Sequence, residues 1–152
     1  MAAIQAYIVV KKLDRTTELR DYPAHTLISC EVDDNLEQAG SRGFGPLVRY
    51  ISGANQARQQ IAMTSPVTHL PHSDVRHTIS FVLPEGMSPE DAPVPVDGSV
   101  RVVEKPDATV AALRWRGGFD ERSAQRAEAK LLTLVQSAGR NPHGSVFFAR
   151  YD

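Results

Sequence analysis

The chain has 152 residues, the size of one ordinary domain, so we expect a single domain over 1–152. Its 17 Lys and Arg residues nearly balance its 18 Asp and Glu residues, and the two signs are interspersed, which argues against a DNA or RNA partner. No apolar run approaches the roughly 20 residues that span a bilayer, and the N-terminus lacks the pattern of a secretory signal. With one cysteine, Cys30, no internal disulfide can form, and we expect a cytoplasmic protein.

The first half of the chain predicts strands, one helix and further strands. The expected elements are strands over 18–22 and 26–32, a helical region ending at Gly53, strands over 61–70 and 78–83, and a Pro-rich loop over 84–97. In the helical region, either Asp33 or Asp34 is the expected N-cap. Its glycines and Pro46 predict a ragged turn over 35–40 and a firmer helix over 46–52.

The second half repeats this order. Pro106 and Thr109 stand 83 positions after Pro23 and Thr26. The expected elements that follow this repeat are strands over 100–104 and 110–115, a helix over 120–137 capped by Asp120, and a closing strand over 145–151. A ββαβ unit therefore occurs twice, over about 13–84 and 98–152, and a ligand groove is expected where two such halves join.

Three motifs resemble a known family. They are ELRDYP at 18–23, YISGAN at 50–55 and IAMTSPV at 61–67, and in this order they resemble the SOUL family of haem-binding proteins over residues 13–152. The resemblance implies an α+β fold, a distorted antiparallel β-barrel built from the duplicated ββαβ unit and flanked by two helices. It also implies a haem or tetrapyrrole ligand held in an apolar groove, for buffering or delivery and without catalysis.

Family chains usually continue beyond the Tyr-Asp pair that Tyr151 and Asp152 match. One strand edge is therefore expected to lack its neighbour. An open edge favours pairing with a second chain, so a homodimer is one expected outcome.

A haem site needs an apolar slot, cations for the propionates and, optionally, an axial ligand. Ile61 and Met63 alternate along the expected strand that follows the firmer helix, near the place where the resemblance implies the porphyrin site. Tyr50 offers an aromatic ring for stacking, and Arg49 and Arg58 offer guanidinium groups for the propionates. The alternative for Met63 and Tyr50 is core packing, and for Arg49 and Arg58 it is a solvated surface.

Axial ligation is where the chain departs from the family pattern. In members that use a histidine ligand, the resemblance places it just before the motif tyrosine, and Asp21 stands there. His69 is the candidate metal ligand that remains, with His25 and Cys30 as alternatives. We therefore expect weak axial coordination or none, and loose specificity among tetrapyrroles.

Two other functions fit the sequence. The duplicated unit also resembles the gyrase-inhibitor-like ligand-binding fold, which implies a sensor or hydrolase that acts on a planar ligand. Glu104 and Trp115 would serve such a site if strand 100–104 paired with strand 110–115. No catalytic motif supports an enzyme, so this alternative depends on fold analogy. The third possibility is an interaction module that uses the exposed face of helix 120–137.

Overall fold

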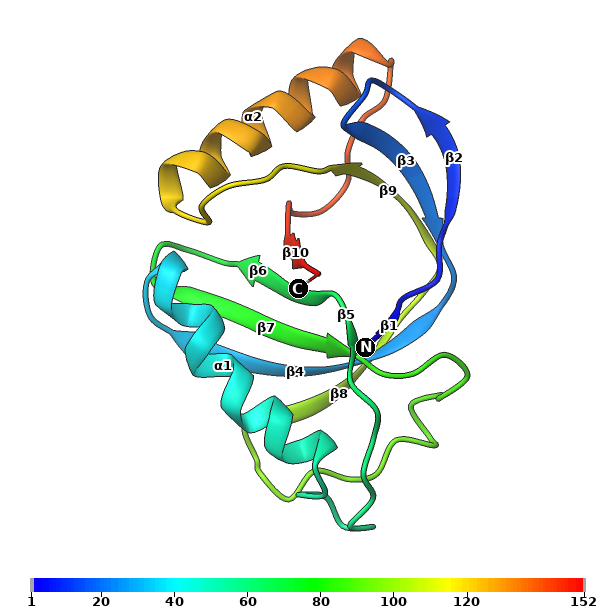
Figure 1. Ribbon diagram of the computed structural model, residues 1–152, viewed down its shortest axis with the longest axis vertical. Helices are drawn as coiled ribbons and strands as arrows, with labels where there is room; N and C mark the ends of the chain where they lie inside the picture. The colour runs from blue at the N-terminus through cyan, green and yellow to red at the C-terminus, as the bar shows by residue number, and fades with distance from the viewer. Residues whose placement is uncertain (1, 152) are drawn as a thin grey trace. The chain divides into compact units, whose positions relative to one another are not determined.

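A computed structural model describes residues 2–151 of the chain, and within them it has ten strands and two helices (Figure 1). In chain order the elements are β1 (Ala3–Ile4), β2 (Ile8–Lys12), β3 (Thr17–Tyr22), β4 (His25–Asp33), α1 (Leu36–Ile51), β5 (Thr64–Ser65), β6 (Val67–Pro71), β7 (Arg76–Val82), β8 (Val100–Lys105), β9 (Ala108–Leu113), α2 (Glu121–Ser137) and β10 (Phe148–Arg150). The expected α+β class is confirmed. The described strands form three sheets, and none of these sheets closes into a barrel.

The chain is organised as two compact units. Unit 1 contains the N-terminal residues up to Gln5, Ala24–Pro106 and the C-terminal residues from Phe147, and unit 2 contains Ala6–Pro23 and Asp107–Val146. The chain passes from one unit to the other directly after Pro23 and again directly after Pro106. These are the prolines that the sequence repeat places at equivalent positions. Because proline cannot donate to a strand ladder, it suits a point where the chain leaves one sheet for another.

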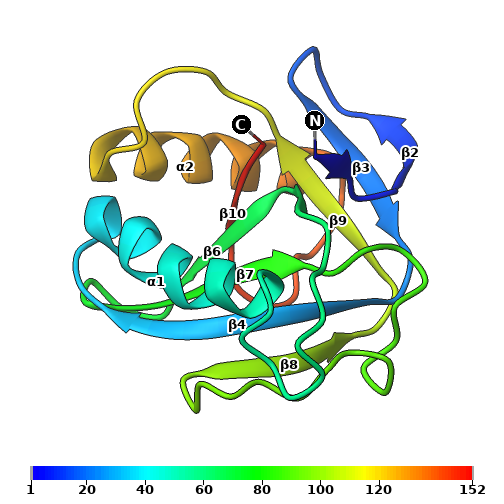
Figure 2. The same cartoon turned by 60° about the horizontal axis from the view of Figure 1, so that its bottom comes forward.

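The core of unit 1 is a five-stranded sheet with one helix packed on it. The sheet has the order β10-β6-β7-β4-β8, and α1 packs mainly against β4 and β7 (Figure 2). Beside it, β1 and β5 form a short parallel pair. Ile28, Leu47 and Ile79 are completely buried between the helix and the sheet. The apolar stripe of the amphipathic helix therefore lies on the sheet, as its spacing predicts.

Helix α1 is continuous from Leu36 to Ile51, so the expected ragged turn over 35–40 is wrong. Its N-cap is Asn35, one residue beyond the expected aspartates, and the Asn35 side chain accepts a hydrogen bond of 2.8 Å from the Gln38 N–H. The helix ends where the sequence predicts, because Gly53 follows it with a φ of 120°. A glycine is favoured at such a helix end, since it adopts positive φ without steric cost.

Close packing explains one of the glycines that weaken the helical pattern. A Cβ atom at Gly43 would lie 2.5 Å from Cγ1 of Ile79 on β7. The glycine is therefore required by a contact between distant parts of the chain, and the local pattern could not show that.

The segment before β5 is not a strand, although the sequence predicts one from residue 61. Ile61 donates its N–H to the Ile51 carbonyl at 2.8 Å, which ties this segment to the end of α1. Burial does not alternate here as it would along a strand: Ile61 is buried and Ala62 exposed, but Thr64 is buried as well.

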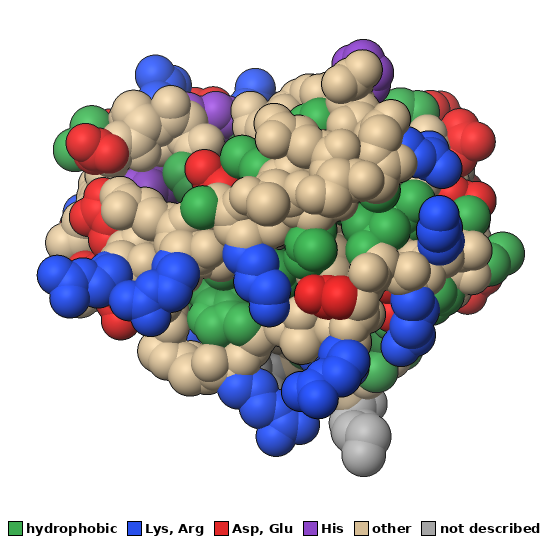
Figure 3. All heavy atoms as spheres, turned by 90° about the horizontal axis from the view of Figure 1, so that it is seen from above, with side chains coloured by type: hydrophobic (Ala, Val, Ile, Leu, Met, Phe, Trp, Pro, Cys, Tyr) green, Lys and Arg blue, Asp and Glu red, His purple; other side chains and the backbone are tan. Residues whose placement is uncertain are grey.

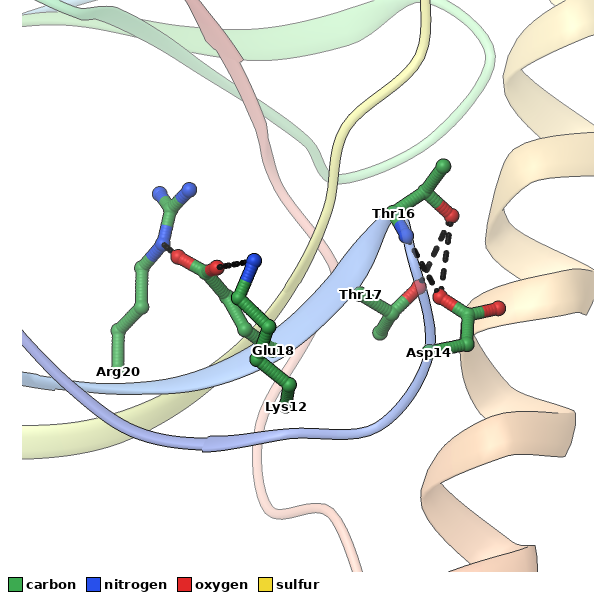
Figure 4. A network of polar contacts seen from close by, with 6 residues as sticks. All are labelled: Lys12, Asp14, Thr16, Thr17, Glu18 and Arg20. Atoms are coloured by element: carbon green, nitrogen blue, oxygen red, sulfur yellow. Dashed lines mark hydrogen bonds and ion pairs between the residues drawn. The ribbon is translucent and has the colours of Figure 1, made fainter.

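Unit 2 contains a three-stranded antiparallel sheet of order β2-β3-β9 and helix α2. Asp120 caps α2 as predicted, and its side chain accepts a hydrogen bond of 2.8 Å from the Ser123 N–H. In the turn between β2 and β3, Asp14 accepts a hydrogen bond of 2.8 Å from the Thr16 N–H (Figure 4). Among residues 2–151, neither helix is long and apolar enough to cross a membrane.

The strands pair across the two sequence repeats. β3 pairs with β9 and β4 pairs with β8, both antiparallel. The pairing of strand 100–104 with strand 110–115 that the sequence suggested is therefore wrong. The alternation of side chains specifies which face of a strand is buried, but it does not specify the partner.

Surface charge follows the composition. On the face drawn in Figure 3, basic side chains lie in several groups, with apolar, polar and acidic side chains between them.

Candidate functional site

Two of the predicted ligand contacts lie in the core of unit 1. Tyr50 is 1% exposed, and its hydroxyl donates a hydrogen bond of 2.6 Å to the carbonyl of Pro93. Burial raises the pKa of this hydroxyl. Ile61 is buried in the same apolar cluster. Both side chains are thus packed in the protein, and for Tyr50 this is the alternative that the sequence left open.

The other three predicted contacts are more accessible. Met63 is half-buried against the core, and Arg49 and Arg58 are exposed. Arg58 has a φ of 52° in the loop that follows α1. Neither of the two hollows described below is lined by any of the five predicted contacts.

Asn55, the last residue of the YISGAN motif, has a structural role. It is 2% exposed. Its amide N–H₂ donates to the carbonyls of Tyr50 at 3.0 Å and Gln59 at 2.9 Å, and its carbonyl accepts from the Gln59 N–H at 2.9 Å. The motif therefore organises the turn after α1.

The candidate metal ligand His69 is buried beside a second histidine. Its Nε2 lies 2.9 Å from Nδ1 of His77 on the neighbouring strand. Burial, assisted by the nearby charges of His77 and Arg150, lowers the pKa of His69 to about 4. Within residues 2–151, no three His, Cys, Asp or Glu side chains come together in a way that could hold a metal ion.

Cys30 faces the core of unit 1 at the edge of a small hollow. Burial raises the pKa of its thiol, so the reactive thiolate is disfavoured. The hollow measures about 300 Å³ and is also lined by Asp33, Arg42 and Ser99. Cys30 is therefore a packed core residue, and the hollow beside it is a shallow polar surface.

The larger hollow lies entirely within unit 2 and measures about 580 Å³. It is lined by Ala6, Tyr7, Ile8, Asp21, Tyr22, Pro23, Asp107, Ala108 and Thr109. These residues lie at or next to the start of β2, the end of β3 and the start of β9. Antiparallel pairing brings these strand ends together, because Asp21 is opposite Ile8 on one side and Thr109 on the other.

Two tyrosines give this hollow its aromatic character. The ring centroids of Tyr7 and Tyr22 are 5.3 Å apart, and the rings are tilted by 43°. The guanidinium carbon of Arg20 lies 4.1 Å from the centroid of the Tyr7 ring, and its Nη1 donates to the Tyr22 hydroxyl at 3.1 Å. Glu18 holds the same guanidinium through Nε at 2.7 Å (Figure 4). The ion pair of Arg20 and Glu18 therefore holds the two tyrosines in place.

Asp21 is the position where the family resemblance implies a histidine in some members. Here its carboxylate accepts a hydrogen bond of 2.6 Å from the Thr109 hydroxyl. The sequence interpretation considered Asp21 only as a missing ligand, and it did not find Tyr7, Asp107 or Thr109. The signal that could have found them is the equivalence of Pro23 and Pro106, because strands that flank equivalent prolines can lie side by side.

Comparison with known proteins places this geometry in context. A sequence model of the family described as SOUL heme-binding protein matches residues 4–152. Heme-binding protein 2 of Mus musculus and Heme-binding protein 2 of Homo sapiens are each 33% identical over 125 residues, which cover 78% of this chain and 59% of the relative. Heme-binding protein 1 of Xenopus laevis is 25% identical over 124 residues, which cover 78% of this chain and 65% of the relative. The chain thus spans less than two thirds of the length of these relatives.

Solved structures share the fold. The C-terminal domain of EcmrR has a TM-score of 0.61 at 15% identity, over 85% of this chain and 79% of that chain. EcmrR in a complex with DNA has a TM-score of 0.59 at 15% identity, over 86% of this chain and 47% of that chain. At this level of identity the likeness concerns the fold alone.

Proposed function

Because the chain belongs to the SOUL heme-binding family, we propose that it binds haem or a related tetrapyrrole and does no chemistry on it. The proposed role is buffering or delivery in the cytoplasm. Haem in this proposal is cargo, so its retention depends on contacts with the macrocycle and its side groups.

The observation that best supports a small-molecule site is the hollow of about 580 Å³ in unit 2. Ligand pockets in proteins span roughly 300 to 1,000 Å³ and combine apolar or aromatic walls with a few polar groups. Tyr7, Tyr22, Ile8 and Pro23 supply such walls, and Asp21 and Thr109 supply polar groups.

The lining fits a porphyrin disc better than it fits an iron centre. Of the side chains that commonly ligate haem iron, it contains two tyrosines but no histidine, methionine or cysteine, and the Tyr22 hydroxyl already accepts a hydrogen bond from Arg20 Nη1 at 3.1 Å. Binding there would rest on stacking with the tyrosines and on apolar contact, with Arg20 beside Tyr7 as a nearby cation. Weak axial coordination or none is therefore part of the proposal.

The residues predicted from the sequence form a second proposed position. Met63 would contact the macrocycle, with Tyr50 and Ile61 behind it and Arg49 and Arg58 as propionate cations. This position would need a local opening, since Tyr50 and Ile61 are buried. For that reason we favour the hollow in unit 2.

Titration of hemin and of metal-free protoporphyrin into the purified protein tests the proposal. Saturable binding of both at one per chain is expected, with dissociation constants within about tenfold, a difference of about 1.4 kcal/mol. Absence of saturable binding to either would overturn the proposal. A much larger preference for hemin would contradict binding without strong iron coordination.

A pair of tyrosine variants tests the location. Tyr22→Ala removes a wall of the hollow and is expected to weaken binding of both compounds about tenfold or more. Tyr151→Ala, at an exposed tyrosine of unit 1, is the matched control and is expected to leave binding unchanged. Circular dichroism checks that each variant is folded. Equal effects of the two variants would exclude the hollow as the site.

A further inference from the structure

The larger hollow carries a charge opposite to the one that a porphyrin carboxylate requires. Two of its nine lining residues are acidic, Asp21 and Asp107, and none of them is a lysine or arginine. Both aspartates are exposed. The cation described above, Arg20, is paired with Glu18 at 2.7 Å, and Glu18 also lies 4.0 Å from the Lys12 ammonium, so Glu18 offsets part of the Arg20 charge.

The carboxylate of Asp21 can accept further hydrogen bonds in the hollow. Asp21 uses one oxygen, Oδ1, to accept from Thr109. A carboxylate has about four lone-pair sites, so further donors can bind. Tyr7 already presents a ring face to a guanidinium at 4.1 Å, which is the geometry of a cation–π contact. Aromatic faces and carboxylates together favour a flat ligand that brings positive charge or N–H donors.

We propose that this hollow selects planar aromatic ligands by charge, accepting a cationic or neutral edge and disfavouring an anionic one. A bound tetrapyrrole would then direct its propionates out of the hollow. The inference rests on the proposed function, because it takes the hollow as the site of a planar ligand, and it adds the chemical class of the edge that enters.

The overall charge of unit 2 would produce the opposite preference. Its two segments, Ala6–Pro23 and Asp107–Val146, contain ten Lys and Arg residues and seven Asp and Glu residues, a net charge of +3. A non-specific field from this unit would attract anions. A preference of the hollow for cations would therefore originate locally, at Asp21 and Asp107.

Two porphyrins that differ only in the ends of their side arms test this inference. The first is metal-free protoporphyrin, with two propionates, and the second is its bis(2-aminoethyl)amide, whose arms end in ammonium groups. At low ionic strength we expect the ammonium compound to bind about tenfold more tightly or better, since one charge contact at 4 Å in water is worth roughly fivefold in affinity. The difference is expected to shrink as salt is added.

Charge-neutralising variants assign the effect to the hollow. The double variant Asp21→Asn with Asp107→Asn keeps the shape of both side chains and is expected to abolish the preference. The matched control is Asp74→Asn with Glu90→Gln, which removes the same charge from exposed loops of unit 1. The control is expected to retain the preference.

The outcomes separate the inference from the proposed function. If protoporphyrin binds as tightly as the ammonium compound or more tightly, the charge inference is overturned while the proposed function stands. If the control variant abolishes the preference as fully as the hollow variant, the effect belongs to the overall charge and the inference is also overturned. If neither compound binds, the proposed function fails.

Discussion

His69 and His77 form a buried pair on neighbouring strands of unit 1. His69 Nε2 lies 2.9 Å from His77 Nδ1, and the rings meet edge to face with centroids 4.8 Å apart. The two side chains are 2% and 1% exposed. Within the described residues, His77 Nε2 has no hydrogen-bond partner. Because His69 has so little access to water, a proton added to its ring would be a poorly solvated charge, and the neutral ring is favoured.

This pair is expected to make stability depend on pH. Burial lowers the pKa of His69 to about 4, while an unfolded histidine titrates near its usual pKa of 6.5. Between these values the unfolded chain binds more protons than the folded chain, so the free energy of unfolding falls as the pH falls. The expected loss is up to about 1.4 kcal/mol per pH unit, of order 3 kcal/mol over the window, with no contribution from His69 above about pH 6.5.

Urea denaturation at a series of pH values from 7.5 to 4.5 measures this dependence. Because carboxylates also titrate at the acid end, the informative quantity is the difference between the wild type and His69→Gln. The glutamine keeps a polar neutral group opposite His77 and cannot be protonated in this range. An identical slope in both proteins between pH 6.5 and 5 would contradict the role of His69.

Gly43 is expected to tolerate no side chain. An alanine Cβ there would lie 2.5 Å from Cγ1 and 2.6 Å from Cβ of Ile79. This overlap involves a branched, completely buried side chain, so Gly43→Ala is expected to destabilise the protein by about 1 to 3 kcal/mol, even though alanine favours the helix. Thermal unfolding measures the effect.

Gly45→Ala in the same helix is the matched control. Its added Cβ would meet only the end of the Arg49 side chain, at 3.4 Å, and a flexible side chain can move aside. The variant is expected to be neutral or to gain up to about 1 kcal/mol from helix propensity. Destabilisation of both variants to the same extent would mean that the backbone of α1 requires glycine for another reason.

Helix caps and Gly43 show where sequence reasoning succeeds for the fold and where it fails. Capping chemistry is local, so Asp120 could be assigned as the N-cap of α2 and Gly53 as the stop of α1. The continuity of α1 through Gly43 depends on Ile79, which lies on a strand far along the chain. Helix propensity scores a glycine without its neighbour in space, and so it predicted a break.

The candidate site was less predictable for a similar reason. Its residues lie at the ends of three strands, and the pairing of β3 with β9 joins the two repeats. Alternation of side chains does not specify which strand is the partner. Motif reasoning led to Tyr50 and Ile61, whose pattern is equally typical of a core, and both are buried. Tyr7 lies outside the motifs that carry the family resemblance, so motif reasoning could not find it.

Asn55 is expected to contribute strongly to stability. Replacement by alanine would remove the side-chain partner of the Gln59 carbonyl and N–H, and the Tyr50 carbonyl would keep only the Gly53 N–H at 3.2 Å. Because these groups lie at a buried or partly buried position, Asn55→Ala is expected to cost about 2 to 4 kcal/mol. Chemical denaturation measures the cost. A loss below about 1 kcal/mol would show that water replaces the side chain.

The position of the ligand can be decided by comparing Met63 with Tyr22. Met63 is half-buried against the core of unit 1, so Met63→Ala is expected to lower the free energy of unfolding by about 1 to 2 kcal/mol through lost packing. Because Met63 does not line the hollow of unit 2, the dissociation constant for hemin is expected to change less than about threefold. Tyr22→Ala is expected to weaken hemin binding about tenfold, because it removes an aromatic wall. Both dissociation constants are measured well below the unfolding transition of the two variants. If Met63→Ala weakens hemin binding more than Tyr22→Ala does, the tetrapyrrole binds at the segment around Ile61 and Met63. Arg49 and Arg58 would then be its propionate partners.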